Sequence, residues 1–361
     1  MKDLKDLRKK INLIDKEMAS LFEERMTIVG EIAESKKQSG ISIYDKDREE
    51  EVVRNNACLI ADETIREYYV NFIRNNMEVS RNYQSRILEG MKVAFSGTEG
   101  AFAHIATSKL FPYANKIGYG SFEEAYRAVE SGDADVCVLP IENSYNGEVG
   151  QVSDLMFFGS LYINSVFDLA ITQDLLGVKG ASISDIKTVI SHPQALGQCA
   201  GYIKEKGFNQ MEYENTALAA KYVAEKSDKS IGAIASAEAA EIFGLSVLER
   251  NINASRTNTT RFAVFSRVKN KHNTNEIGLH TILLFTVKNE AGALAKAIDV
   301  IGKHGFNMRC LRSRPVKELL WQYYFYIEAE GNIDSDEGLV MMKELENYCD
   351  KLKAVGTYLK K

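Results

Sequence analysis

An apolar stripe with helical spacing in the first forty residues is the feature that most constrains the fold. Its positions step along the chain by three and four, with one gap, and are Leu4, Leu7, Ile11, Ile14, Met18, Leu21, Ile28 and Ile32. This spacing predicts an amphipathic helix of about 33 residues, about 50 Å long. The rest of a small helical module cannot cover so long a helix, so we expect it to pack against a second copy.

The gap in the stripe holds a cation. Arg25 occupies the seam position there, flanked along the same seam by Arg8 and Lys36. Because an unpaired buried cation is destabilising by several kcal/mol, Arg25 needs a carboxylate from the protein or from a ligand. Three cations along one seam favour a site for a dianion. The alternative is an arginine that extends to solvent or pairs with a neighbouring glutamate.

Two further helical segments carry polar side chains at helical spacing. Asp45, Arg48 and Glu49 stand at i, i+3 and i+4, on one predicted helical face. A third helix, over 64–88, has an apolar stripe that turns polar at Ser80 and Gln84. Alone, this serine and glutamine would belong to a solvated face. Beside the seam cations, we interpret them as donors inside a pocket.

This module, residues 1–90, resembles the all-helical chorismate mutases over its whole length. The resemblance implies that chorismate, a dicarboxylate, is rearranged to prephenate without nucleophile or cofactor, by holding the reactive geometry and stabilising charge on the ether oxygen. The roles that it implies are carboxylate binding for Arg25, Arg48 and the partner subunit's Arg8, donation to the ether oxygen for Lys36 and Gln84, and contacts to the ring hydroxyl for Asp45 and Glu49, with Ser80 as a further polar contact.

Residues 91–268 alternate short apolar strands with helices, and polar clusters stand at the turns. One lobe has strands at 91–95 and 134–139, and a second spans about 188–235, with a helix expected over 195–206. The chain then returns through Thr259, Thr260 and Arg261 into an alternating segment over 261–268 that predicts a strand. Such a path predicts a two-lobed α/β domain with a cleft, where side chains after strands meet a ligand. The clusters are 97–100, 140–144, 191–194 and 258–262. About half of these residues would serve as helix caps whatever the function.

Together the four clusters resemble the prephenate dehydratase family, and the two lobes are similar to type II periplasmic binding proteins. The resemblance implies loss of water and carbon dioxide from prephenate, giving phenylpyruvate, without metal or cofactor. Thr260 is the implied catalytic hydroxyl and Arg261 its anion-binding neighbour. The other residues expected to line the cleft are Glu142, Asn143, Ser144, Gln194 and Thr216. A threonine hydroxyl is a poor acid unaided, so Thr260 either gives the proton or orients another donor, with His192 as an alternative.

After a polar stretch typical of a linker, 269–275, residues 278–361 follow the order βαββαβ and resemble an ACT domain. Its helices are expected over 293–304 and 337–352, and its last strand over 354–358. Gly292, Ala293 and Leu294 match the family's ligand-cradling motif, which implies phenylalanine as the effector. Arg312, however, stands where the family has glutamate. The inverted charge predicts reduced sensitivity to phenylalanine, and the alternative is that Arg312 pairs with a local acid.

In this order the domains resemble the bifunctional chorismate mutase/prephenate dehydratases. The sequence thus predicts a multidomain enzyme of phenylalanine biosynthesis, all-α, then α/β, then α+β, acting as a homodimer or larger oligomer. A net charge of -5 gives no general attraction to nucleic acid or membrane. Dispersed cysteines indicate reduced thiols, and a polar N-terminus predicts a cytoplasmic protein. The alternatives are retention of only one activity, or a small-molecule sensor without catalysis.

Overall fold

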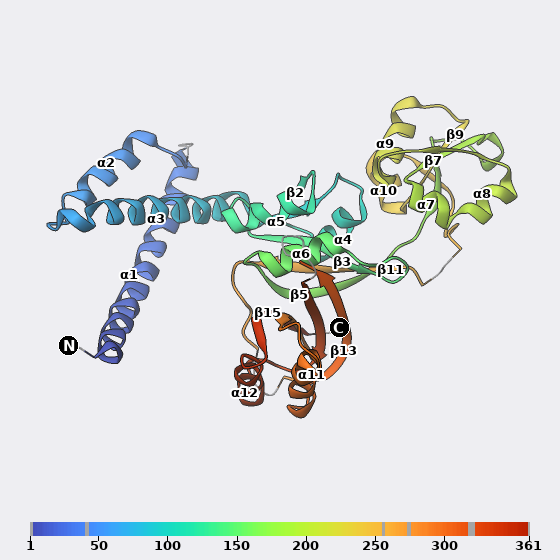
Figure 1. The fold of residues 1–361 in the computed structure, drawn as a ribbon. Helices are drawn as coiled ribbons and strands as arrows, with labels where there is room; N and C mark the ends of the chain where they lie inside the picture. The colour runs from blue at the N-terminus through green and yellow to red at the C-terminus, as the bar shows by residue number, and fades with distance from the viewer. Residues whose placement is uncertain (1–2, 40–42, 255–256, 273–275, 317–321, 360–361) are drawn as a thin grey trace. The chain divides into compact units, whose positions relative to one another are not determined.

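The computed structural model describes residues 3–39, 43–254, 257–272, 276–316 and 322–359. The chain forms two compact units, Met1–Lys92 (unit 1) and Val93–Lys361 (unit 2), and each is described by itself. Residues 273–275 of the expected linker lie outside the described residues. Figure 1 shows unit 1 built of helices and unit 2 as a mixed arrangement of helices and strands.

Unit 1 consists of helices α1 (Leu4–Ser39), α2 (Lys46–Ala57) and α3 (Glu63–Glu89). The α1 helix is three residues longer than about 33, and α3 agrees with the predicted span within one residue at each end. Aspartates are the N-caps of the other two helices. Asp45 accepts from the backbone N–H of Arg48, and Asp62 accepts from that of Thr64, so each satisfies a free donor of a first turn.

The apolar stripe of α1 is exposed along its whole length. Val29 and Ala33, each one residue beyond a stripe position, are buried between the helices of unit 1. The stripe positions are all at least 43% exposed, and they are Leu4, Leu7, Ile11, Ile14, Met18, Leu21, Ile28 and Ile32. Since apolar area left in water is unfavourable by about 25 cal/mol per Å², a single copy of unit 1 leaves much of its hydrophobic surface unused.

In unit 2, the first lobe is built on a six-stranded sheet. The strand order is β2-β1-β3-β11-β5, with the short β4 paired to β3. Strands β1 and β3 run parallel, whereas β11 runs antiparallel to both of its neighbours, β3 and β5. The elements of this lobe are β1 (Lys92–Ser96), α4 (Phe102–Leu110), β2 (Asn115–Tyr119), α5 (Phe122–Ser131), β3 (Val136–Asn143), β4 (Gly147–Glu148), α6 (Gly150–Phe158), β5 (Tyr162–Ala170) and β11 (Thr259–Ser266).

The second lobe lies between β5 and β11 in sequence and has a five-stranded sheet of its own. Its strand order is β10-β6-β9-β7-β8, parallel around β7 and antiparallel around β6. Its elements are β6 (Asp174–Gly177), η1 (Ile183–Asp185), β7 (Thr188–Ser191), α7 (Pro193–Gln198), α8 (Ala200–Lys206), β8 (Asn209–Glu212), α9 (Thr216–Lys226), β9 (Ile231–Ala235), α10 (Ala237–Phe243) and β10 (Ser246–Glu249).

The last part of unit 2 has the expected order βαββαβ and forms a four-stranded antiparallel sheet, β13-β14-β12-β15. We call it the C-terminal sheet. Its elements are β12 (Leu279–Val287), α11 (Ala293–Lys303), β13 (Asn307–Pro315), β14 (Tyr323–Glu330), α12 (Asp336–Leu345) and β15 (Cys349–Leu359).

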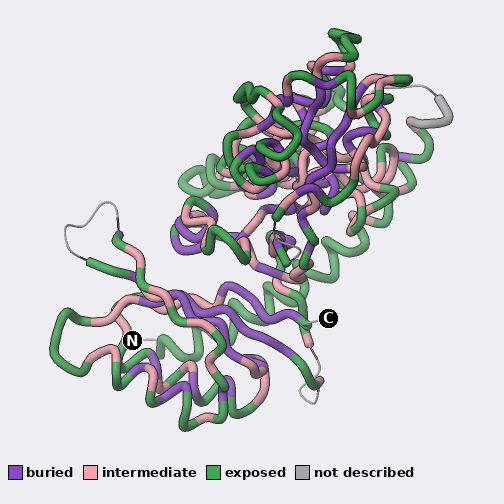
Figure 2. The backbone as a smooth tube through the Cα atoms, turned by 90° about the vertical axis from the view of Figure 1, so that its right-hand side faces the viewer, coloured by how far each residue is buried: buried purple, intermediate pink, exposed green. Residues whose placement is uncertain are grey.

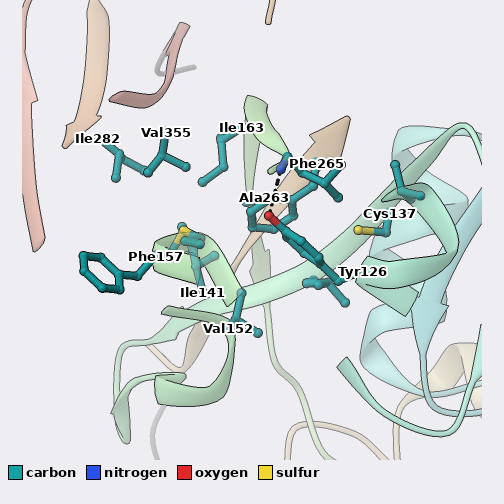
Figure 3. Close-up of a cluster of buried hydrophobic side chains, with 14 of the residues drawn as sticks. Tyr126, Cys137, Ile141, Val152, Phe157, Ile163, Ala263, Phe265, Ile282 and Val355 are labelled. Atoms are coloured by element: carbon teal, nitrogen blue, oxygen red, sulfur yellow. Dashed lines mark hydrogen bonds between the residues drawn. The ribbon is translucent and has the colours of Figure 1, made fainter. Parts of the chain in front are cut away.

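Both faces of the C-terminal sheet are buried, as the alternation along β12 shows. Leu283 and Phe285 belong to the cluster formed with α11 and α12, whereas Ile282 and Leu284 belong to the core of the first lobe. Figure 2 shows burial concentrated in the strands of unit 2. In Figure 3, Ile282 and Val355 meet the first-lobe cluster around Tyr126 and Phe157. The sheet is therefore a shared layer between two hydrophobic cores.

Two predicted helices in unit 2 are wrong in their bounds. The segment expected as one helix over 195–206 is divided at Cys199 into α7 and α8, in a stretch weakened by Gly197 and Gly201. The helix expected over 337–352 ends at Leu345, and Cys349–Leu352 instead begin β15. There the pairing of β15 with β12 along its length prevails over local helical spacing.

Two lysines of β15 close the C-terminal end of α6. Lys353 donates to the carbonyl oxygen of Met156 at 2.6 Å and to that of Gly159, and Lys351 donates to that of Phe157 at 3.1 Å. Cations suit the free carbonyls at a helix end. Burial lowers the pKa of Lys353 to about 8, with the charge of Lys351 acting in the same direction.

This pKa predicts a pH dependence of stability. Between pH 8 and 10.5 the unfolded chain retains the proton of Lys353 while the folded chain releases it, so the free energy of unfolding of unit 2 rises with pH across that window. We expect Lys353→Met to flatten this rise in thermal denaturation curves recorded through the window. Lys351→Met is the matched control and should retain most of the slope. Equal slopes for wild type and Lys353→Met would contradict the assignment.

Candidate functional site

The pairing of β3 with β11 builds the centre of the candidate site. In this antiparallel pair Thr260 stands opposite Asn143, and Arg261 stands opposite Glu142. Because successive residues of a strand point to opposite faces of a sheet, the first pair faces one way and the second pair the other. Strand β3 continues past its predicted end at 139, and β11 begins at Thr259, two residues before its predicted start, so that Glu142, Asn143 and Thr260 lie within strands.

Hydrogen bonds fix the orientation of the Asn143 amide. Its Oδ1 accepts from the backbone N–H groups of Tyr145 and Asn146, both at 3.0 Å, which leaves Nδ2 as the donor at the other end. Nδ2 donates to Thr260 Oγ1 at 2.9 Å and to Asn258 Oδ1 at 2.8 Å. With its oxygen accepting from Asn143, the Thr260 hydroxyl is left to donate its own proton elsewhere.

Thr260 and Asn143 line a cleft of about 420 Å³ between residues of the two lobes. First turns of three helices contribute to its wall: Phe102 of α4, Gln194 of α7 and Thr216 of α9. Free backbone N–H groups and the helix dipole make such ends favourable for anions. The cleft is therefore suited to a small anionic ligand beside the Thr260 hydroxyl.

Several further polar residues line the cleft and were not predicted. They are Asn146, Glu148, Gln173, Gln198 and Asn215, and Asn258 of the predicted cluster 258–262 lines the cleft as well. The Oε1 atoms of Gln173 and Gln198 are buried without a hydrogen-bond partner, which leaves two acceptors for a ligand. Gln198 follows Gln194 by four residues in one helix, so helical spacing could have revealed it. Gln173 lies between β5 and β6, where only the three-dimensional fold shows its position.

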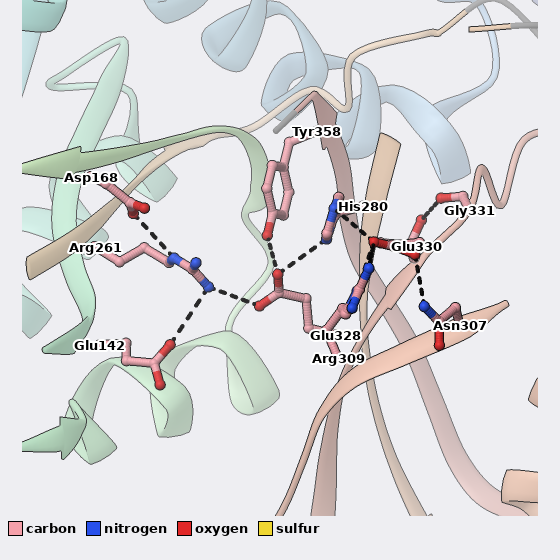
Figure 4. A network of polar contacts seen from close by, with 11 residues as sticks. Glu142, Asp168, Arg261, His280, Asn307, Arg309, Glu328, Glu330, Gly331 and Tyr358 are labelled. Carbon is pink, nitrogen blue, oxygen red and sulfur yellow. Dashed lines mark hydrogen bonds and ion pairs between the residues drawn. The ribbon is translucent and has the colours of Figure 1, made fainter. Parts of the chain in front are cut away.

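Arg261 and Glu142, both expected in the cleft, face the C-terminal sheet instead (Figure 4). Arg261 donates from Nε to Asp168 Oδ1 at 3.2 Å and from a terminal nitrogen to Glu328 Oε2 at 3.1 Å, and Glu142 Oε2 lies 3.6 Å away. Burial opposes its charge, yet the carboxylates of Glu328 and Asp168 hold the pKa of Arg261 above the usual value. Its guanidinium is thus engaged by protein carboxylates.

Two more residues of the predicted clusters have partners of their own. The Ser144 hydroxyl donates to the carbonyl of Thr257 and accepts from the N–H of Thr259, and it thereby ties the end of β3 to the start of β11. His192 lines the cleft but is also the N-cap of α7, where Nδ1 accepts from the N–H of Gln194. That contact leaves Nε2 as the ring nitrogen without a partner in the N-cap.

In unit 1 the structure brings part of the predicted polar set together. Arg25 donates to the Ser80 hydroxyl at 2.5 Å, so that α1 and α3 are joined at the gap of the apolar stripe. Burial lowers the pKa of Arg25, and Gln84, one turn beyond Ser80, is buried with its Oε1 unpartnered. Lys36 donates to the carbonyl of Ile43 at 2.5 Å. Arg25, Ser80 and Gln84 thus leave polar capacity for a ligand.

The other predicted residues of unit 1 are engaged or distant. Asp45 is the N-cap of α2 and not a member of its helical face, because α2 begins at Lys46. Arg48 pairs with Glu51 and Glu49 pairs with Arg81, each at 2.6 Å. Arg8 is exposed on α1, about 25 Å along the helix axis from Arg25.

The glycine-containing loop before α11 adjoins a cavity of about 280 Å³. Gly292 is the N-cap of α11 with φ of 84°, a conformation that favours glycine. Of the three predicted effector residues, Leu294 lines this cavity, together with Glu290, Tyr323 and others. Arg312 lies elsewhere, because its guanidinium donates to Glu142 of β3 and stacks over Tyr326. It therefore finds an acid outside its own sheet.

The cysteines form no disulfide, and the described helices and acidic or metal-ligating side chains show neither a membrane span nor a metal site. All five cysteines are free thiols. Within the described ranges, no helix combines the length and apolar character needed to cross a membrane. In the same part of the chain, no three His, Cys, Asp or Glu side chains are grouped in a way that could hold a metal ion.

The chain matches the models of two enzyme families. Residues 93–270 match the prephenate dehydratase family, and residues 7–85 match type II chorismate mutase. Among solved structures, a prephenate dehydratase from Arthrobacter aurescens in complex with L-Phe is 26% identical, covering 75% of this chain and 90% of that one with a TM-score of 0.68. GqqA, described as a novel type of quorum quenching acylase, is 31% identical over 75% of this chain and 98% of that one, with a TM-score of 0.69.

A relative of matching length shows the particular family. The bifunctional chorismate mutase/prephenate dehydratase of Aquifex aeolicus is 32% identical over 100% of this chain and 99% of its own length. The chain belongs to the bifunctional chorismate mutase/prephenate dehydratase family.

Proposed function

We propose that the chain converts chorismate to prephenate in unit 1 and prephenate to phenylpyruvate, water and carbon dioxide in the cleft of unit 2. The observation that carries the second reaction is the Asn143–Thr260 hydrogen bond at the wall of a cleft bordered by helix N-termini. The full-length relationship to bifunctional enzymes supports the pairing of both reactions in one chain.

In the cleft, the Thr260 hydroxyl would act on the departing hydroxyl group of prephenate. The bond to the ring carboxylate breaks, its electrons complete the aromatic ring, and the hydroxyl leaves with a proton. The amide of Asn143, which donates to Thr260 Oγ1, stabilises negative charge developing on that oxygen and so favours proton donation. Helix N-termini of α4 and α9 would hold the carboxylates, a role expected of Arg261 from the sequence.

In unit 1, Arg25 with Ser80 and Gln84 would bind one end of chorismate, and Lys36 would turn from the Ile43 carbonyl to the ether oxygen. Arg8 cannot reach Arg25 of its own helix over about 25 Å. A second copy, packed along the exposed apolar stripe of α1, would supply the partner subunit's Arg8. This requirement supports a homodimer, in which Arg48 and Glu49 exchange some of their present partners for substrate.

The proposed domains are a chorismate mutase at 1–90, a prephenate dehydratase at 91–268 and an ACT domain at 278–361, in a cytoplasmic enzyme. The βαββαβ order and the cavity beside Leu294 support phenylalanine as an effector of the last domain. Because Arg312 faces Glu142 and is not part of that cavity, we propose that reduced sensitivity would come from altered transmission to the cleft.

A time course tests the proposed function. Purified protein is given chorismate, and prephenate and phenylpyruvate are measured separately, with and without phenylalanine. We expect prephenate to appear first and phenylpyruvate to follow, with weak inhibition by phenylalanine. Untouched chorismate with turnover of added prephenate would reject the mutase alone, and absence of both products would reject the whole proposal. Inhibition at low micromolar phenylalanine would reject reduced sensitivity.

Thr260→Val removes the hydroxyl at nearly constant shape. We expect kcat for phenylpyruvate formation from prephenate to fall by about a hundredfold or more, in the range of a lost general acid, while chorismate turnover is unchanged. Thr259→Val is the matched control, because the neighbouring position points to the opposite face of β11. A Thr260→Val enzyme with the kcat of this control would show that the proton has another source, such as His192.

Arg25→Met removes the cation at the gap of the α1 stripe. A buried charged partner is worth about 2 to 5 kcal/mol to a bound ligand, so we expect kcat/KM for chorismate to fall by about thirtyfold or more. Phenylpyruvate formation from prephenate should be unchanged. Arg54→Met, at an exposed arginine of α2, is the control and should leave both activities intact. Wild-type kcat/KM for chorismate in Arg25→Met would exclude a substrate contact.

A further inference from the structure

The hairpin formed by β3 and β4 places two carboxylates opposite each other. Glu142 of β3 stands directly opposite Glu148 of β4 in the pairing register. Like charges at opposed positions of an antiparallel pair are destabilising. The same hairpin supplies Asn143, Asn146 and Glu148 to the cleft wall, so its conformation decides the shape of the cleft.

Strand β13 of the C-terminal sheet supplies cations to both carboxylates. Arg312 donates to Glu142 Oε1, and its guanidinium lies 5.4 Å from the centre of the Tyr326 ring. Arg314, two residues on and hence on the same face, has Nε 3.4 Å from Glu148 Oε1 and 3.3 Å from Asp154 Oδ1. A side chain at Gly150 would collide with the Arg314 guanidinium, so glycine leaves room for this contact.

Glu142, which binds Arg312, is the chain neighbour of the residue that holds the Thr260 hydroxyl. Glu142 precedes Asn143, whose amide donates to Thr260 Oγ1 at 2.9 Å. On the other strand Arg261 follows Thr260 and is bound by Glu328 of β14. The C-terminal sheet therefore contacts both strands of the Asn143–Thr260 pair at the very next residue. A shift of either strand would move the hydroxyl relative to the substrate.

We propose that Arg312 is a positioning residue for the cleft, which neutralises Glu142 against Glu148 and thereby keeps the Asn143 amide on Thr260. The inference rests on the proposed dehydratase function. It assigns to a side chain of the C-terminal sheet a part in the geometry of the reaction, without contact to the substrate. Misplacement of a reacting group by about 1 Å lowers a rate by about a hundredfold, so a partial loss of alignment is measurable.

The test uses the full chain and the variant Arg312→Gln, with prephenate as substrate. We expect kcat for phenylpyruvate formation to fall by about ten- to a hundredfold, with KM for prephenate changed by less than about threefold, because alignment and not binding is affected. Arg309→Gln is the matched control: Arg309 lies on the same strand but pairs with Glu330 inside the C-terminal sheet. The control should keep the wild-type kcat.

Adding Glu142→Gln to Arg312→Gln provides the second measurement. The double variant has no repulsion left in the hairpin, so we expect it to fold and to recover kcat to within about threefold of wild type. If Arg312→Gln matches Arg309→Gln, or if the folded double variant shows no recovery, the inference is overturned. These outcomes are read only against an active wild type, whose failure to convert prephenate would instead reject the proposed function.

Discussion

The antiparallel pairing of β3 with β11 is the constraint on which the rest of unit 2 depends. It joins Asn143 and Thr260, which are 117 residues apart in the sequence. The whole second lobe is formed by the residues between them. Were this pairing absent, β11 and β5 would be detached from the other strands of the first-lobe sheet, and the cleft would lose one wall. Contacts of such long range form late and slowly, because loop closure must precede them.

The same pairing explains why Thr260 lines the cleft, as expected, whereas Arg261 does not. The motif around 258–262 was expected to act as one group at the mouth of a strand. In the structure β11 already begins at Thr259, so period-two alternation sends Thr260 and Arg261 to opposite faces. A strand placed two residues earlier would have predicted this from the sequence. The carboxylates that receive Arg261 come from three distant segments, and no local pattern indicates them.

Sequence patterns over a few residues predicted the elements that depend on contacts between near neighbours. The α1 stripe and the βαββαβ order depend on neighbours within a few residues, and they were predictable for that reason. The end of α12 was not, because Cys349–Leu352 are drawn into β15 by pairing with β12, more than 60 residues earlier. The buried acceptors of Gln173 and Gln198 likewise become neighbours of one cleft only after two lobes have formed.

The interface between the C-terminal sheet and the first lobe combines two kinds of contact with different consequences. Apolar packing, such as Phe157 stacked on Tyr324 at 4.3 Å, supplies attraction but tolerates small sliding, because its energy varies slowly with lateral position. Charged hydrogen bonds from Glu328 and Arg312 tolerate little sliding, because they weaken steeply with distance and angle. The apolar core therefore holds the C-terminal sheet against the first lobe, and the ion pairs determine the position of the sheet along the lobe. A ligand or a substitution that alters the C-terminal sheet would then shift the sheet along the lobe and move Asn143 and Thr260 before it disturbed the apolar core.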